Sequence, residues 1–448
     1  MAGWQLITLS LPIVILFFLA HKKKAWLEIL PSIFWFFFMS LPYFFLTNFL
    51  NGYFQSNQFL GILTITSAMF IGDLIGIKNY RNTSKKLRSS YSVQIKRKTR
   101  VKLAAVIHSV LFLIPLAQIF MTDSLPIKIL LFSNNTGFDL ANARQTFTKG
   151  SNLPILIELL IAWYIPLISA LCLFFLWRLG YKKSSILWFH LIIIYSILGL
   201  EKAPLVFFVL TIFISVSLVY HKFSKIRLVF TLAIFFILLS LNAIAQVYVS
   251  DINVDKNYLV SKEFQSSRLL GIVTPSDTYR FDKLPDTNVP KPVMNIVYRT
   301  TLTPIDVSFR YYQYYSQDEI SNRNLIEVLA YRESPKSTNI VGNWAFTKRF
   351  PSKYSEYIDA YASIDADSFS LIGSRGFLIV GLILVLLRYF FAKLGNGILI
   401  GKYIYGMSIA FFSYLPFQGG LQSMLVSKGL LILLLISWSF KKFSKQTS

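Results

Sequence analysis

Cysteine and histidine are scarce in this chain. The 448 residues include one cysteine, Cys172, which lies in an apolar run, so no disulfide can form within the chain. The four histidines are scattered, and no zinc-binding spacing, G-x-S-x-G pattern or Walker loop occurs. A disulfide-stapled scaffold is therefore excluded, and we expect no metal site and no bound cofactor.

Acidic residues are also few: 21 Asp and Glu stand against 45 Lys and Arg, which gives a net charge of +24. An excess of this size could indicate nucleic-acid binding. The basic residues, however, stand in short runs beside apolar segments, as in the cytoplasmic loops of membrane proteins. The longest run, 78–102, holds ten Lys or Arg and no acid, so we interpret it as a loop at an anionic lipid surface, with no nucleic acid as partner.

Apolar residues, by contrast, are abundant. Hydrophobic types make up 54% of the chain and 41 residues are Phe, which is more than a soluble domain of this length needs. Apolar runs of about 17–25 residues can span a bilayer as helices. We therefore predict an all-α polytopic integral membrane protein with about eleven transmembrane helices, at 4–20, 26–47, 57–77, 102–121, 154–177, 185–200, 203–220, 227–246, 370–391, 403–417 and 421–440.

The basic residues also predict the orientation of these spans. The charges of the first span follow it, in HKKK, and the basic runs come after odd-numbered spans, which places those ends inside. The segment 246–369 has 14 Lys and Arg against 15 Asp and Glu, so we expect it outside. The chain is thus predicted N-out and C-in, with three parts: 1–246 with spans 1–8, 247–369 as a large outer loop, and 370–448 with spans 9–11 and an inner tail.

The large outer loop is expected to be partly helical. In TPIDVSFRYYQYY (303–315), Thr303 suits an N-cap, Pro304 the first helical position and Asp306 the first turn. A second short helix is expected at 321–332. Because a long loop with structure of its own is often functional, this loop is a candidate functional element.

A carboxylate and an ammonium stand side by side in SILGLEKAPLVFFVL (196–210), between two apolar runs. Each such charge costs about 2.5–3.5 kcal/mol at a bilayer centre on insertion scales. One interpretation is a turn at the outer membrane surface whose charges reach the headgroups. The other is a polar site in which Lys202 meets an anion and Glu201 lies beside it.

Further cations are expected on the same side or within the last span. A solvated arginine is an ordinary feature of a loop, whereas an ionisable residue inside an apolar span is a functional candidate by default. Arginine binds phosphate through paired hydrogen bonds and lysine acts as a point charge, so these cations predict an anionic lipid headgroup, such as a lipid pyrophosphate. They are Arg144 in NNTGFDLANARQTFTKG, Arg299 and Arg310 in YRTTLTPIDVSFRYYQYY, Arg375 in SLIGSRGFLIVG, and Lys428 in LQSMLVSKGLLILLL.

All four histidines are expected on or near the inner side, so an outer site would need a carboxylate as its general base. Candidates are Glu201, Asp306, and the D-x-D pair Asp365 and Asp367 before span 9, which could also be only a polar entry to a helix. Tyrosines crowd the outer loop at 311–315 and 354–361. They are interpreted either as an interfacial belt or as a platform on which sugar rings stack.

Taken together, this layout resembles the bacterial O-antigen or oligosaccharide repeat-unit polymerases of the Wzy type. The resemblance covers most of the chain at the level of topology, with many spans and one large periplasmic loop in the C-terminal half. Locally, GLEKAPL resembles the Lys-Pro turn between two central spans, and YRTTLTPIDVSFRYYQYY resembles an arginine followed by an aromatic-rich helix. DSFSLIGSRGFLIVG and GGLQSMLVSKG resemble the entry to the next span and the last span.

The resemblance implies a membrane glycosyltransferase without a cofactor in the bacterial inner membrane, with its active site facing the periplasm. Such polymerases transfer a growing glycan from undecaprenyl pyrophosphate to the non-reducing end of the next lipid-linked repeat unit. The implied partners are undecaprenyl-pyrophosphate-linked oligosaccharides and membrane lipids, with a chain-length regulator and a flippase in the same pathway. By carry-over, the substrate-binding cations are Lys202, Arg299, Arg310, Arg144, Arg375 and Lys428, and the catalytic carboxylates are Glu201, Asp306 and Asp367.

Three rival functions stay open. An O-antigen ligase shares the many-span plan and the donor, but its motif includes a periplasmic histidine that is not expected here. A lipid-linked oligosaccharide flippase would need polar residues lining many spans, whereas Lys428 stands almost alone within the predicted spans. A membrane acyltransferase would also lack its usual outer histidine.

Overall fold

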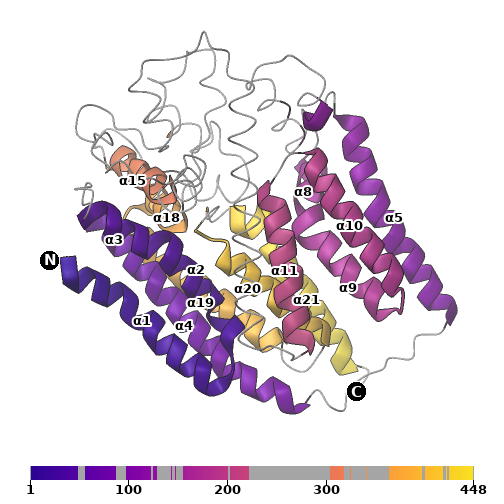
Figure 1. The fold of residues 1–448 in the computed structure, drawn as a ribbon, viewed down its shortest axis with the longest axis horizontal. Coiled ribbons are helices and arrows are strands. Elements are labelled where there is room, and N and C mark those ends of the chain that lie inside the picture. The colour runs from indigo at the N-terminus through magenta and orange to yellow at the C-terminus, as the bar shows by residue number, and fades with distance from the viewer. Residues whose placement is uncertain are drawn as a thin grey trace, which may run out of the picture.

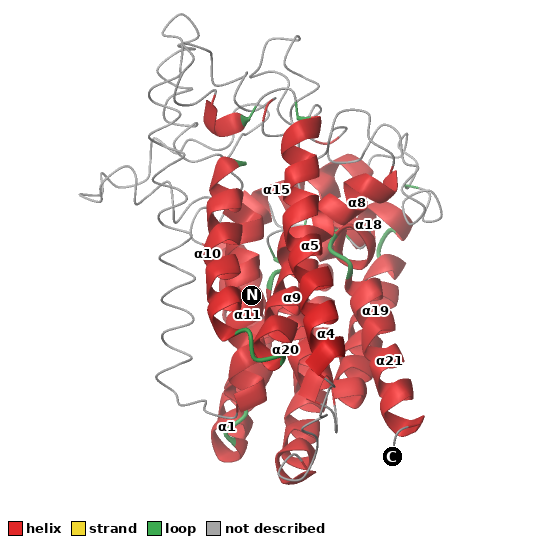
Figure 2. Ribbon diagram, turned by 90° about the vertical axis from the view of Figure 1, so that its right-hand side faces the viewer, coloured by secondary structure: helices red, strands yellow, loops and turns green. Residues whose placement is uncertain are grey.

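The structure is a computed structural model, and it describes residues 2–48, 56–86, 97–122, 125–128, 143, 147, 155–199, 202–220, 303–316, 323, 341, 363–395, 399–416, 420 and 423–446. Every regular element in these ranges is a helix, and they contain no strand. The prediction of an all-α chain is therefore confirmed for the described part. The helices run side by side along one axis of a bundle (Figures 1 and 2).

Each predicted span contains described helix except span 8, 227–246, which lies outside the described residues. The first five spans correspond to α1 (Ala2–Lys23); η1 (Trp26–Ile29), α2 (Leu30–Trp35), η2 (Phe36–Ser40) and α3 (Leu41–Asn48); α4 (Ser56–Lys86); α5 (Arg97–Met121); and α8 (Ile155–Trp163), η4 (Tyr164–Ser169) and α9 (Ala170–Arg178). The later elements are α10 (Lys182–Leu198), α11 (Lys202–Tyr220), α15 (Thr303–Tyr315), α18 (Ile364–Ile372), α19 (Arg375–Gly395), α20 (Leu399–Ser413), η10 (Ser423–Ser427) and α21 (Leu430–Gln446).

Within the described residues, six stretches are long and apolar enough to cross a membrane by length and composition. They are Trp4–Lys23, Trp26–Phe44, Ser56–Asn79, Arg97–Met121, Ile157–Arg178 and Arg375–Gly395. Large apolar side chains on the outer faces of these helices are exposed, among them Phe18, Phe112 and Leu378. A surface of this kind suits a lipid environment, so the chain has the character of a helical membrane protein.

Two helix pairs fix the relative directions of the central helices. A Cβ atom added to Gly61 of α4 would lie 3.0 Å from the Phe377 ring of α19, and one added to Gly72 would lie 3.0 Å from Arg388 Cγ. Because the difference in residue number is the same for both contacts, α4 and α19 run parallel (Figure 1). By contrast, α11 and α20 run antiparallel, because Phe207 packs on Tyr414 at one end and Ser215 on Gly406 further along.

Two of the predicted spans are broken by glycine. The predicted span 370–391 is in fact the short helix α18, a turn at Gly373 with φ of 63°, and then α19. The last span is also not continuous, because Lys428 and Gly429, whose φ is 76°, separate η10 from α21. Glycine adopts this left-handed conformation without the steric cost that other residues meet, so a helix can end there and restart in a new direction.

The helix predicted at 303–315 is present as α15 (Thr303–Tyr315). Its apolar face is buried, with Ile305, Phe309 and Tyr312 exposed by 2%, 7% and 0%. α15 packs on α18 and on the first turns of α4, so this part of the predicted outer loop is seated directly on the helix bundle (Figure 1). Of the second predicted helix, 321–332, only Arg323 is among the described residues.

Candidate functional site

A buried carboxyl group joins α15 to α18. Asp365 is fully buried; Tyr312 donates a hydrogen bond of 3.1 Å to its Oδ2, and the Ser363 hydroxyl donates to its Oδ1. The hydroxyls of Ser308 and Ser363 lie 2.5 Å apart and extend this network back to α15. Burial raises the pKa of Asp365 above its ordinary value, and burial together with Asp365 also raises the pKa of Tyr312. Because both Asp365 oxygens already accept hydrogen bonds in the interior, this member of the D-x-D pair holds the two helices together.

The second acid of the D-x-D pair, Asp367, forms an ion pair. Arg323 Nη1 lies 2.5 Å from Asp367 Oδ1 and 2.9 Å from Ser370 Oγ, and the Arg323 backbone N–H donates to the Ser370 carbonyl at 2.9 Å. Both charged side chains are 8% exposed. Sequence reasoning missed Arg323, although Asp367 and Ser370, three residues apart on one helix face, offered a matching acceptor pair.

Arg310 is the predicted substrate-binding cation that the structure describes in α15. It is 2% exposed, its Nη1 donates a 3.0 Å hydrogen bond to Gln313 Oε1, and its guanidinium lies 5.6 Å from the centre of the Phe309 ring. These contacts lie within α15 itself, so they hold the arginine in place beside its own helix.

Lys428 lies against two aromatic rings at the helix break. Its Nζ is 5.3 Å from the centre of the Tyr414 ring and 6.0 Å from that of Phe207, and the two rings are 5.3 Å apart. An ammonium near the faces of aromatic rings is attracted by their quadrupoles, most strongly where water is excluded. Lys428 was predicted inside a continuous span; it in fact follows η10 and precedes the turn at Gly429.

The Lys428 site, meaning Lys428 with Phe207 and Tyr414, lies toward the end of the bundle that carries α18. Phe207 comes five residues after Lys202, the first residue of α11, so about 7–8 Å of helix separates them. A Cβ atom added to Gly420 would lie 3.5 Å from Asp367 Oδ2, and the Gly420 carbonyl accepts the Met424 N–H at the start of η10. Gly420 therefore lies beside Asp367 and is bonded to the start of η10, which Lys428 follows.

The other predicted site residues are not brought into this group by the described contacts. Arg375 is exposed at the first residue of α19. Lys202 begins α11 and Asp306 lies in α15, but their side chains are outside the described part, as are Glu201, Arg144 and Arg299 entirely.

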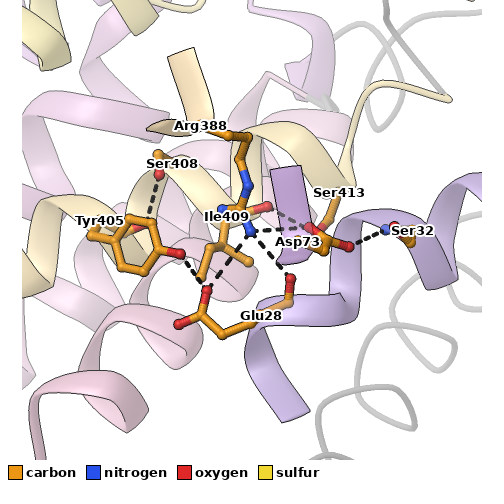
Figure 3. A network of polar contacts seen from close by, with 8 residues as sticks. All are labelled: Glu28, Ser32, Asp73, Arg388, Tyr405, Ser408, Ile409 and Ser413. Atoms are coloured by element: carbon orange, nitrogen blue, oxygen red, sulfur yellow. Dashed lines mark hydrogen bonds and ion pairs between the residues drawn. The ribbon is translucent and has the colours of Figure 1, made fainter. Parts of the chain in front are cut away.

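A second polar cluster, which we call the ion clamp, lies inside the helix bundle (Figure 3). Arg388 Nη2 of α19 is 3.0 Å from Asp73 Oδ1 of α4, 3.7 Å from Glu28 Oε2, and 3.1 Å from the Glu28 carbonyl oxygen. Tyr405 of α20 donates its hydroxyl hydrogen to Glu28 Oε2. Lys402, one turn before Tyr405 and 4% exposed, is the fifth member and lies within electrostatic reach of Glu28.

The ion clamp corrects one conclusion from the sequence. Lys428 is not almost alone within the apolar helices, because Glu28, Asp73 and Arg388 lie in three of the predicted spans and are buried. Each is a charge in an apolar run, a signal that was visible in the sequence. Their mutual contact was not, since Glu28 and Arg388 are 360 positions apart.

The described residues contain no group of three or more His, Cys, Asp or Glu side chains placed to hold a metal ion. The arrangement offers instead a fixed ammonium, an ion-paired carboxylate and aromatic walls. No family model, no curated protein and no solved structure matches this chain.

Proposed function

We propose that this chain polymerises lipid-linked oligosaccharide repeat units by glycosyl transfer from an undecaprenyl-pyrophosphate donor. The observation that carries the proposal is the Lys428 site: an ammonium against the Tyr414 and Phe207 rings, at a helix break in an apolar bundle. An ionisable residue within an apolar helix bundle is a candidate functional group, and an ammonium attracts an anionic headgroup that enters from the lipid.

The proposed reaction needs a group that stabilises the leaving diphosphate. The bond between the anomeric carbon of the donor glycan and the diphosphate oxygen breaks, and a hydroxyl oxygen of the acceptor sugar forms the new bond to that carbon. Negative charge then develops on the diphosphate. Lys428, and Lys202 about 7–8 Å beyond Phe207 along α11, are the cations we assign to that charge.

The hydroxyl proton of the acceptor must pass to a base. We assign this role to Asp367, the catalytic candidate whose side chain the structure describes. Arg323, whose Nη1 lies 2.5 Å from Asp367 Oδ1, is the residue that orients it. Glu201 and Asp306 are the alternatives. Asp365 is a poor base because both its oxygens are buried acceptors within α15 and α18.

We also propose the full topology: eleven spans, N-out and C-in, in the bacterial inner membrane, with the Lys428 site facing the periplasm. The parallel packing of α4 and α19 supports it, because both correspond to odd-numbered spans. The antiparallel packing of α11 on α20 supports it as well, since these correspond to spans 7 and 10. The choice of sides rests on the distribution of Lys and Arg.

Transport of a lipid-linked oligosaccharide across the membrane is the second candidate function. The observation in its favour is the ion clamp, since buried ionisable residues within apolar helices often mark a transport pathway. A flippase and a polymerase of the same pathway act on the same lipid-linked unit, so the two are separated by their products.

The surface-glycan ladder of cells distinguishes these functions. A strain lacking the gene is complemented with the wild-type chain, Lys202→Ala or Lys428→Met at matched membrane levels. We expect the deletion to leave one repeat unit on the lipid core, the wild type to restore the ladder, and both variants to remain at one unit. A core with no repeat unit in the deletion strain would instead favour transport or ligation.

A further inference from the structure

The ion clamp ties four elements together at a distance from the Lys428 site. Glu28 comes from η1, Asp73 from α4, Arg388 from α19, and Tyr405 and Lys402 from α20. Along α4, twelve residues separate Asp73 from Gly61, which contacts Tyr312 of α15. At 1.5 Å per residue this is about 18 Å, more than half the thickness of a bilayer's hydrocarbon core. The ion clamp therefore lies toward the end of the bundle opposite α15.

The charges of the ion clamp balance. Two carboxylates, Glu28 and Asp73, face two cations, Arg388 and Lys402, and all four side chains are exposed by 4% or less. Asp73 also accepts the Ser32 backbone N–H at 3.1 Å. A buried set of this kind is held firmly, because removal of any one charge leaves an uncompensated partner in the interior.

The helices also meet closely around these charges. A Cβ atom on Gly76 of α4 would lie 2.5 Å from Glu28 Oε2, 2.7 Å from the Tyr405 hydroxyl and 3.2 Å from Arg388 Nη2. The backbone of α4 thus approaches the charged groups as closely as glycine permits. Side chains of α19 and α20 thus pack directly against the backbone of α4 here.

We propose that the ion clamp stays closed throughout the working cycle, so that the Lys428 site takes up and releases its substrate only from the α15 end of the bundle. The identity of that substrate rests on the proposed function, but the closed clamp does not. An alternating-access carrier would have to separate these helices once in every cycle. A clamp that never opens therefore excludes alternating access between these helices.

Labelling of one buried cysteine tests this proposal. In a Cys172→Ala background the substitution Ser408→Cys places the only thiol beside Tyr405, because Ser408 is fully buried and donates to the Tyr405 carbonyl at 2.7 Å. Right-side-out and inverted membrane vesicles are prepared from cells that make the lipid-linked unit and from cells that cannot. The vesicles are then treated with a membrane-impermeant maleimide. The control Lys23→Cys, at an exposed position at the end of α1, should be labelled from one side.

We expect Ser408→Cys to remain unlabelled from both sides, with or without lipid-linked substrate. Addition of Arg388→Met should raise its labelling about tenfold or more, because two buried carboxylates that face only one cation, Lys402, favour opening. Tyr405→Phe is the substitute variant if Arg388→Met fails to fold. It removes one hydroxyl and should give a milder increase in labelling. Labelling that depends on substrate, or labelling unchanged by both clamp variants, would overturn the proposal. The readout does not involve polymer formation, so loss of the ladder and failure of the clamp are separate results.

Discussion

Lys428 is the residue on which the proposed chemistry depends most. Its position at the break between η10 and α21 places its ammonium against the Tyr414 and Phe207 rings. A lysine at an exposed helix end can form the same kind of ring contact without any role in binding. The chain offers such a residue for comparison in Lys442, whose Nζ lies 5.5 Å from the centre of the Trp438 ring.

We predict that Lys428→Met reduces the rate of polymerisation by about 100-fold or more, the effect of removing one preorganised stabiliser of a developing charge. Lys442→Met should leave the rate unchanged, since Lys442 is exposed in the last turns of α21. Both rates are measured from glycan chain growth at matched membrane levels. Equal rates in the two variants would show that the ring contact of Lys428 serves packing alone.

Asp365 makes stability depend on pH in a defined direction. Because burial raises the pKa of Asp365 in the folded protein, the folded state binds this proton more tightly than the unfolded state. The associated stability is present below the ordinary carboxyl pKa and is lost as pH rises through the folded value, by up to about 1.4 kcal/mol per pH unit.

We therefore predict that the melting temperature of the wild-type chain falls as pH rises through this window, and that Asp365→Asn flattens the fall. Tyr312→Phe removes one donor to the carboxylate, which raises the pKa of Asp365 further and should extend the fall to higher pH. Thermal unfolding of the detergent-solubilised protein over a pH series measures the three slopes. Identical slopes for the wild type and Asp365→Asn would contradict the burial of this carboxyl.

At the scale of elements, the helix signals in the sequence were local and were mostly interpreted correctly. Thr303 and Pro304 predicted the start of α15, and the apolar runs predicted the helices that line the bundle. The breaks at Gly373 and Gly429 were missed, because a glycine within an apolar run is compatible with a continuous helix until tertiary packing requires a turn.

Close packing of α15 on α4 depends on Gly61. A Cβ atom at this position would collide with the Tyr312 hydroxyl and lie 3.0 Å from the Phe377 ring, whereas one at Gly381 would make ordinary contacts of 3.5 Å with Thr64 and 3.6 Å with Ala68. We predict that Gly61→Ala destabilises the protein by about 1–3 kcal/mol. Gly381→Ala should be neutral or stabilise by up to about 1 kcal/mol through helix propensity. Chemical or thermal unfolding of both variants checks this, and equal effects would contradict the seating of α15 on α4.

At the scale of the whole molecule, the ion clamp is the feature that sequence reasoning could not assemble. Glu28, Asp73 and Arg388 were each visible as a charge in an apolar run, but the parallel packing of α4 on α19 that joins them is a long-range contact. The same limit applies to Arg323, whose partner Asp367 is 44 positions away. The sequence indicated each predicted cation of the candidate site separately. That Lys428 lies near the start of α11 follows only from tertiary packing.

The ion clamp should respond differently to partial and complete removal of its charges. Arg388→Met leaves two buried carboxylates and is expected to cost about 3–5 kcal/mol of stability. The quadruple variant Glu28→Gln, Asp73→Asn, Arg388→Met, Lys402→Met, which removes all four charges, should recover most of this loss. Arg100→Met serves as the control, because Arg100 also lies over a tyrosine ring, at 5.7 Å from Tyr181, but is exposed. The melting temperatures of all three variants are compared, and a quadruple variant as unstable as Arg388→Met would contradict the pairing.

The central claim, that this chain joins lipid-linked repeat units, is tested most directly by reconstitution. The purified full-length chain in lipid vesicles is given an undecaprenyl-pyrophosphate-linked repeat unit and no nucleotide, and the lipid-linked products are separated by size. We expect a ladder of two and more units, together with released undecaprenyl pyrophosphate, and no ladder with Lys428→Met. Lipid-linked units that stay single while they move from one leaflet to the other would contradict it.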